Sequence, residues 1–220
     1  MSLWVKICGN TSFEDALLAA EAGADAVGFV FAPSPRRISP AKVAEIVPRL
    51  PAMLEKIGVF VDAPFEDIES VVRSSRLTGV QLHFTTAPEL PARLRNRFGP
   101  ALTVLRVVHF GELTAVELAK IMQDPHVDAV LVDSRTALAA GGTGQAFDWV
   151  EARKTLFQTA DLQKRMVAAG GLTPENVAQA IAALRPWGVD VVSGVEAAPG
   201  RKDPAKVRAF IDSARDADGD

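Results

Sequence analysis

The chain has 220 residues, of which 48% are hydrophobic and 23% charged, as is typical of a globular protein and not of a disordered or fibrous one. Its 24 basic and 27 acidic side chains give a formal net charge of −3, which gives no reason to expect nucleic acid or an anionic membrane as a partner. The single cysteine excludes a disulfide within the chain and does not indicate an oxidising compartment.

The N-terminal segment does not have the basic start and apolar run of a secretory signal. The longest apolar stretches of the chain are too short to span a bilayer. We therefore expect a soluble, cytoplasmic protein whose partner is a small molecule.

Eight short runs rich in β-branched residues alternate with longer segments rich in Ala, Leu and Glu. The runs are Leu3–Cys8, Ala26–Phe31, Lys56–Val61, Gly79–His83, Leu102–Val107, Ala129–Asp133, Met166–Ala169 and Asp190–Ser193. Most are almost continuously apolar, which is the pattern of parallel strands that helices cover on the outside.

The segments between these runs carry helix start signals. Ser12 precedes two acidic residues, and a hydroxyl or carboxylate residue precedes proline at Ser39-Pro40, Thr173-Pro174 and Asp203-Pro204. Gly23 stands where the first helix should end.

Eight strand–helix units in 220 residues predict an α/β fold, a single (β/α)₈ TIM barrel over residues 1–220. An acidic tail at 216–220 should fray. The structural alternative is a doubly wound open sheet, but the first turn, Cys8-Gly9-Asn10-Thr11, lacks the glycine fingerprint common in that fold.

In a barrel of this kind, function lies at the C-terminal ends of the strands. The polar residues predicted at those ends are Cys8, Arg36, Arg37, Asp62, His83, Arg106, Asp133, Gly170-Gly171 and Ser193-Gly194. These side chains include candidates for an acid, a base and anion recognition.

Glycine-rich loops follow three successive strands in the second half of the chain. They contain Gly141-Gly142-Thr143-Gly144, Gly170-Gly171 and Ser193-Gly194. Glycine lets backbone N–H groups approach an anion, and barrels often bind phosphate with the loops after strands 7 and 8. Each loop alone could be only a tight turn, but three neighbouring loops favour a phosphate site.

Cys8 and Asp133 end the first and sixth predicted strands. A cysteine in an apolar strand is usually a small buried hydrophobe, but a thiol facing the mouth could act as a general base. Asp133 could cap a helix or pair with Arg135, whereas an apolar pocket would favour its protonated form and allow it to donate a proton.

The basic residues leave alternatives open. Arg36 could bind a substrate carboxylate or lie in a solvated loop, and His83 could be a donor or an ordinary loop residue. Lys6 shares the inner face of its strand with Cys8 and needs a partner, for which Asp190 or Glu196 could serve. No His, Cys or acidic residues cluster at metal-ligand spacing, so we expect no metal.

Several motifs in this order resemble the phosphoribosylanthranilate isomerase family of tryptophan biosynthesis. They are Val5-Lys6-Ile7-Cys8-Gly9, Gly23-Ala24-Asp25-Ala26-Val27-Gly28, Ser34-Pro35-Arg36, Val80-Gln81-Leu82-His83, Leu131-Val132-Asp133, Gly141-Gly142-Thr143-Gly144, Gly170-Gly171-Leu172-Thr173-Pro174 and Ser193-Gly194-Val195-Glu196. The resemblance covers residues 4 to 212 or so.

The resemblance implies a barrel enzyme without cofactor that performs an Amadori rearrangement. N-(5-phosphoribosyl)anthranilate would become 1-(2-carboxyphenylamino)-1-deoxyribulose 5-phosphate, with Cys8 as general base and Asp133 as general acid. Arg36 would bind the anthranilate carboxylate. His83 and the glycine-loop residues Gly142, Thr143, Gly144, Gly170, Gly171, Ser193 and Gly194 would bind the rest of the phosphoribosyl substrate. The chain would be a monomer or a homodimer.

Three residues depart from the family pattern, namely Phe84, Val192 and Arg37. They leave open the affinity and the specificity for the substrate. A related isomerase of histidine biosynthesis would use paired aspartates, and this chain has Cys8 where the first would stand. A non-catalytic phosphate-binding barrel is a further alternative, which the presence of both Cys8 and Asp133 disfavours.

Overall fold

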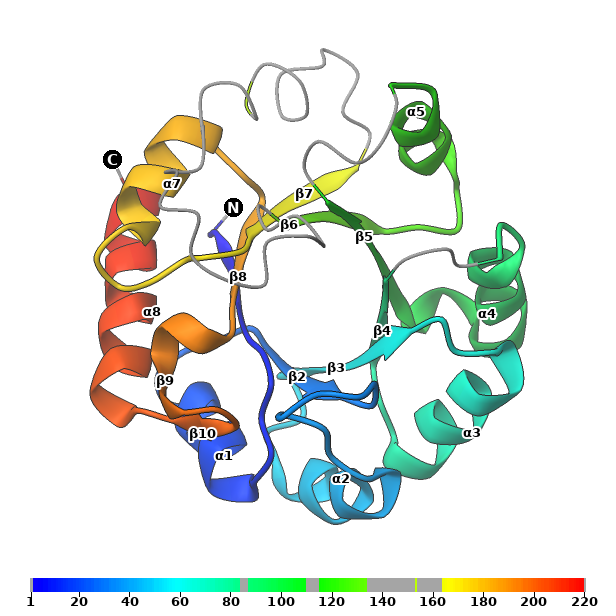
Figure 1. Cartoon of the computed structure of the whole chain (residues 1–220), viewed down its shortest axis with the longest axis horizontal. Coiled ribbons are helices and arrows are strands. Elements are labelled where there is room, and N and C mark those ends of the chain that lie inside the picture. The colour runs from blue at the N-terminus through cyan, green and yellow to red at the C-terminus, as the bar shows by residue number, and fades with distance from the viewer. Residues whose placement is uncertain (1, 84–86, 110–114, 134–152, 154–163, 220) are drawn as a thin grey trace.

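The computed structural model describes residues 2–83, 87–109, 115–133, 153 and 164–219. Within these residues, eight parallel strands close into a barrel in chain order, with β8 paired to β1 (Figure 1). The strands are β1 (Trp4–Ile7), β2 (Ala26–Val30), β3 (Glu55–Val61), β4 (Gly79–His83), β5 (Thr103–His109), β6 (Ala129–Asp133), β7 (Arg165–Ala169) and β8 (Gly188–Val191). The predicted (β/α)₈ barrel is confirmed.

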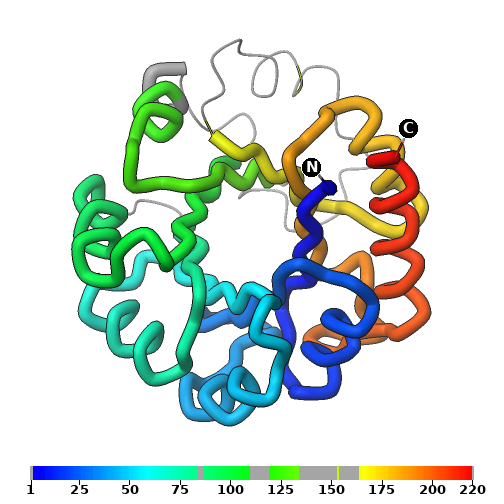
Figure 2. The backbone as a smooth tube through the Cα atoms, turned by 180° about the vertical axis from the view of Figure 1, so that it is seen from behind, coloured from blue at the N-terminus to red at the C-terminus, as the bar shows by residue number. Residues whose placement is uncertain are grey.

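Helices surround the barrel, as the views from both ends show (Figures 1 and 2). They are α1 (Phe13–Glu21), α2 (Pro40–Ile46), α3 (Phe65–Ser75), α4 (Leu90–Phe98), α5 (Ala115–Gln123), α7 (Val177–Leu184) and α8 (Pro204–Asp218). Short 3₁₀ turns occur at η1 (Val47–Arg49), η2 (Gly99–Ala101) and η4 (Ser193–Val195), and a small hairpin joins β9 (Glu196–Ala198) to β10 (Arg201–Lys202). No described helix has both the length and the apolar character needed to cross a bilayer.

The helix start signals form the expected caps at three places. The side chains of Ser12, Ser39 and Asp203 accept hydrogen bonds from backbone N–H groups in the first turns of α1, α2 and α8. The signal at Thr173 works differently, because α7 begins only at Val177. There Asn176 Oδ1 accepts a hydrogen bond from the Thr173 N–H at 2.8 Å, which holds a turn ahead of the helix.

Two sequence-based boundaries differ from the structure. Strand β8 ends at Val191 and not at Ser193, because Val192 turns out of the extended conformation (φ −122°, ψ −83°) into η4. The tail expected to fray is helical through Asp218, whose carboxylate accepts a hydrogen bond from the Leu3 N–H at 2.7 Å. Asp220 lies outside the described residues.

The core has two layers, one inside the barrel and one between strands and helices. The inner layer consists of Trp4, Ala26, Ile57, Leu105, Val107, Ala129, Leu131, Val167 and Ala169, and Trp4 stacks on Trp187 with ring centroids 5.2 Å apart. Trp4 begins β1 and Trp187 precedes β8, so this stack lies where the strands start. The interior is therefore filled toward that end, and a ligand must enter from the other end.

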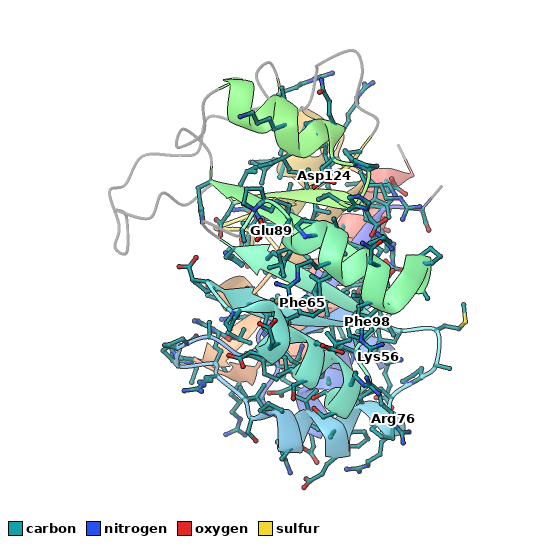
Figure 3. All side chains as sticks on the ribbon, turned by 90° about the vertical axis from the view of Figure 1, so that its right-hand side faces the viewer. Lys56, Phe65, Arg76, Glu89, Phe98 and Asp124 are labelled. Atoms are coloured by element: carbon teal, nitrogen blue, oxygen red, sulfur yellow. The ribbon has the colours of Figure 1, made fainter. Side chains whose placement is uncertain are left out.

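The side view shows how the loops divide between the two ends (Figure 3). Lys56, near the start of β3, lies toward the end where α3 and α4 finish at Arg76 and Phe98. Phe65 and Glu89, at the beginnings of these helices, lie toward the opposite end. The strand-to-helix loops therefore share one face of the molecule.

Candidate active site

A cavity of about 220 Å³ opens at the C-terminal ends of the strands. The predicted site residues that line it are Cys8, Arg36, His83, Asp133, Gly170, Gly171 and Ser193. Larger hollows of about 480 and 580 Å³ lie beside α3, but neither contains Cys8 or Asp133. We therefore place the candidate site by its chemistry and not by its size.

Cys8 directly follows β1, and its N–H continues the parallel ladder by donating to the Val191 carbonyl oxygen at 2.9 Å. Only 3% of the residue is exposed. Its side chain lies against Gly28 of β2, where an added Cβ would overlap Sγ and come within 3.0 Å of the Cys8 Cβ. Gly28 thus provides the room in which the thiol lies.

Lys6 lies two residues before Cys8 and is completely buried. Its Nζ donates to Asp190 Oδ1 and to Gln81 Oε1, both at 2.9 Å, so of the two partners that the sequence left open, Asp190 is the one observed. Gln81 also bonds through Nε2 to His83 Nε2 at 2.9 Å. The role of Gln81 was not predicted, because its partner lies 75 positions away in sequence.

Opposing effects act on the pKa of Lys6, in β1, and on the pKa of Cys8, which follows β1. Burial raises the pKa of the Cys8 thiol, and the Lys6 ammonium opposes that rise without cancelling it. Burial lowers the pKa of Lys6, but the Asp190 carboxylate and Cys8 outweigh it and hold that pKa above its usual value. Lys6 is therefore a permanent buried cation beside a mostly protonated thiol.

Asp133 is the last residue of β6 and is buried, with its strand neighbours His109 and Ala169 in register. It lines the same cavity as Cys8. The proposed alternative partner Arg135 lies outside the described residues. The structure thus brings the candidate acid and the candidate base to one cavity, from β6 and β1.

Arg36 forms a two-point ion pair that the sequence did not reveal. Its Nε and Nη2 donate to Glu196 Oε1 and Oε2 at 2.8 and 2.7 Å. The hydrogen bonds to Glu196 raise the pKa of Arg36. Burial alone would raise the pKa of Glu196, but Arg36 and Lys202 bring it below its usual value. Arg36 is thus not in a freely solvated loop, and Glu196 pairs with it and not with Lys6.

Lys202 connects this ion pair to the backbone at Cys8. Its Nζ donates to the carbonyl oxygens of Cys8 at 2.6 Å and Val192 at 3.1 Å, and it lies 3.5 Å from Glu196 Oε1. Burial lowers the pKa of Lys202 more than Glu196 raises it. The hairpin of β9 and β10 therefore braces the ends of β1 and β8.

The loops after β7 and β8 pack directly against each other. Gly170 and Gly171 adopt positive φ values of 86° and 64°, a conformation that favours glycine. At Gly194 an added Cβ would overlap the carbonyl oxygen of Leu172, so only glycine permits this approach. Gly194 does not itself line the cavity, and Gly142, Thr143 and Gly144 lie outside the described residues.

The departures from the family pattern fall in different places. Val192 lines the cavity, whereas Arg37 lines one of the hollows beside α3. Phe84 lies outside the described residues. Of the two departures that the structure describes, only Val192 can contact a ligand in the candidate site.

Comparison with known proteins identifies the family. Residues 5–213 match the family model described as N-(5'phosphoribosyl)anthranilate (PRA) isomerase. The N-(5'-phosphoribosyl)anthranilate isomerases of Trichlorobacter lovleyi and Pelobacter propionicus are 44% and 43% identical, over 97% and 96% of this chain and 98% and 95% of theirs.

Solved structures agree with this match. The phosphoribosyl anthranilate isomerase of Thermotoga maritima is 37% identical, with a TM-score of 0.82 over 97% of this chain and 99% of that one. A structure of such an enzyme in complex with reduced 1-(o-carboxyphenylamino)-1-deoxyribulose 5-phosphate is 37% identical, with a TM-score of 0.81 and the same coverage. The chain belongs to the N-(5'-phosphoribosyl)anthranilate isomerase family.

Proposed function

We propose that Cys8 and Asp133 are the general base and general acid with which this chain isomerises N-(5-phosphoribosyl)anthranilate. The observation that supports these roles is that one cavity is lined by both groups, at the ends of β1 and β6. The product is 1-(2-carboxyphenylamino)-1-deoxyribulose 5-phosphate, whose reduced form is bound in a structure of a relative.

In this mechanism, Asp133 gives a proton to the ribose ring oxygen, and the C1–O bond breaks to leave a cationic Schiff base. That cation makes the C2 proton more acidic, so a modest base suffices to remove it. Cys8 takes the proton as its thiolate, and the resulting enolamine tautomerises to the ketone. Acid and base groups in such positions each contribute roughly 10²–10⁴-fold to the rate.

Substrate binding uses the remaining residues of the cavity. Among the described residues Arg36 Nη1 makes no hydrogen bond, so this nitrogen remains for the anthranilate carboxylate while Glu196 holds Nε and Nη2. The loops of Gly170, Gly171, Ser193 and Gly194 offer backbone N–H groups to the phosphate. We assign Gly142, Thr143 and Gly144 to the same phosphate site and His83 to the sugar.

The test is a fluorescence assay of substrate loss with the purified chain and no added metal. Cys8→Ala and Asp133→Asn should each lower kcat by about 10²–10⁴-fold. Asp62→Asn is the matched control, since Asp62 is also a strand-end carboxylate but lines a different hollow. Near-normal turnover by both Cys8→Ala and Asp133→Asn would show that these roles are wrong.

Two further expectations remain proposals. The Thermotoga maritima relative is described both as dimeric and as generated monomers, and we propose a monomer or a homodimer for this chain. Light scattering on the purified protein decides between these states and larger assemblies. We also propose a cytoplasmic location, which cell fractionation tests.

A further inference from the structure

A fully buried ammonium group lies beside the proposed catalytic thiol. Lys6 lies in β1 and Cys8 directly follows that strand, and the alternation of side chains along the extended chain places both on the inner face. A buried ion pair is often no more stable than apolar residues of the same volume. The stability of the barrel therefore does not explain why a lysine occupies this interior position.

Three strands fix this ammonium group in place. Asp190 is the register partner of Lys6 across the β1–β8 ladder, and Gln81 comes from β4. An ammonium has three N–H donors, and these two residues accept two of them. Cys8 is a further electrostatic neighbour of Lys6. The charge is thus held in place by two side chains, Asp190 and Gln81, that line the same cavity as Cys8.

We propose that Lys6 is a positioning residue whose ammonium, anchored by Asp190 and Gln81, stabilises the thiolate of Cys8. This inference rests on the proposed role of Cys8 as base. Only a thiolate can accept the C2 proton, and burial disfavours that anion. A fixed positive charge near this buried thiol compensates for part of that cost.

Other charges also act on this thiol. The titratable or charged groups around Cys8 are Lys6, Arg36, His83, Asp133, Asp190, Glu196 and Lys202. Of these, Lys6 lowers the pKa of Cys8 more strongly than Asp190 raises it. The two members of the ion pair act on the thiol with opposite signs, and the effect of the ammonium is the larger of the two.

The experiment titrates the thiol itself, and Cys8 is the only cysteine in the chain. Thiolate absorbance near 240 nm and the pH dependence of iodoacetamide alkylation report this one group without any isomerase assay. Lys6→Met should shift the titration to higher pH and slow alkylation at neutral pH about 10-fold or more. Asp190→Asn should shift the titration to lower pH.

A matched control is Lys56→Met. Lys56 is also a buried lysine on a barrel strand, but its Nζ donates to the carbonyl oxygens of Pro51 and Ala52, toward the opposite end of the barrel (Figure 3). This variant can lose stability and should leave the thiol titration unchanged. The Lys6→Arg variant restores the charge and should recover part of the alkylation rate.

The acidic limb of the kcat/KM profile gives an independent readout. Activity should rise with pH as Cys8 loses its proton, so Lys6→Met should move this limb to higher pH. If Lys6→Met and Lys56→Met leave the titration equally unchanged, the inference is wrong. It is also wrong if Lys6→Met and Asp190→Asn shift it in the same direction, because that indicates altered packing. If the titration shifts as expected but Cys8→Ala remains active, the proposed function fails and not the effect of the charge.

Discussion

Removal of the Glu196 carboxylate should weaken both the fold and substrate binding. Its side chain is 4% exposed and accepts hydrogen bonds from Arg36 Nε, Arg36 Nη2 and the Gly200 N–H, the last at 3.2 Å. Lys202 is a second cation within 4 Å. No other described carboxylate pairs with either cation, so Glu196→Ala leaves two positive charges side by side.

The size of the stability loss in Glu196→Ala follows from the burial of Arg36 and Lys202. Removing one partner of a buried ion pair costs roughly 3–5 kcal/mol. The Arg36 side chain is 22% exposed and can be partly rehydrated, whereas that of Lys202 is fully buried. We therefore expect Glu196→Ala to lower the free energy of unfolding by about 2–4 kcal/mol. Glu196→Gln keeps an acceptor and the shape and should cost about 1–2 kcal/mol.

The stability difference should depend on pH in a defined direction. The pKa of Glu196 is lowered from 4.5, since Arg36 and Lys202 outweigh burial. A carboxyl whose pKa is lower in the folded state contributes fully above its unfolded pKa and loses that contribution as pH falls through the folded value. The advantage of the wild type over Glu196→Gln should therefore be full near neutral pH and shrink below pH 4.5.

Urea denaturation at several pH values measures the loss of stability in the Glu196 variants, and steady-state kinetics measures the weaker substrate binding. Loss of Glu196 frees the Arg36 guanidinium from its orientation, so KM should rise while kcat changes little. Glu45→Ala is the control, because Glu45 forms an exposed ion pair with Lys42 of the kind worth about 0–1 kcal/mol. A Glu196→Ala variant no less stable than Glu45→Ala, with an unchanged KM, would refute the reasoning.

Two other substitutions test the packing and the charge of the barrel. Gly28→Ala places a methyl group against Cys8 and should cost about 1–3 kcal/mol in stability, as denaturation would show. Steady-state kinetics should show a lower kcat and a smaller change in KM. An unchanged kcat would contradict a fixed position of the thiol. Burial raises the pKa of Glu55 from 4.5, although the Glu55 carboxylate accepts a hydrogen bond from Trp4 Nε1. The folded protein therefore loses stability as pH rises from 4.5 through the pKa of Glu55 in the folded state, because the buried carboxyl becomes charged. Glu55→Gln should therefore have a higher Tm than the wild type at pH 7 and lose this advantage below pH 4.5 in thermal scans; a lower Tm at pH 7 would contradict it.

The barrel could be predicted because its signals are local. Each strand is a short apolar run, and every predicted boundary lies within two residues of the observed one. The last strand shows the limit of this reasoning. Val192 and Ser193 are compatible with a strand by composition, but the approach of Gly194 to Leu172 turns the chain there. That contact depends on another loop, which a local pattern does not contain.

The positions of Cys8 and Asp133 were also predictable, because the ends of parallel strands meet at one mouth. The partners of the charged residues were harder to predict from the sequence. Asp190 and Glu196 were the two choices for Lys6, and the structure pairs Asp190 with Lys6 and Glu196 with Arg36. The Arg36–Glu196 pair spans 160 positions and the bond from Lys202 to Cys8 spans 194. Such pairs form only once the barrel closes.

Two buried lysines act on Cys8, one on its side chain and the other on its backbone. Lys6 acts on the thiol from within the barrel, and Lys202 donates to the Cys8 carbonyl oxygen at 2.6 Å from outside it. Each lysine has its own carboxylate, Asp190 at 2.9 Å and Glu196 at 3.5 Å. A buried ion pair is often no more stable than apolar residues of the same volume, so stability alone does not explain either pair. Both lysines act on Cys8, Lys6 through the pKa of the thiol and Lys202 through a hydrogen bond to the carbonyl oxygen. This arrangement is expected if the position and the charge state of Cys8 govern the reaction.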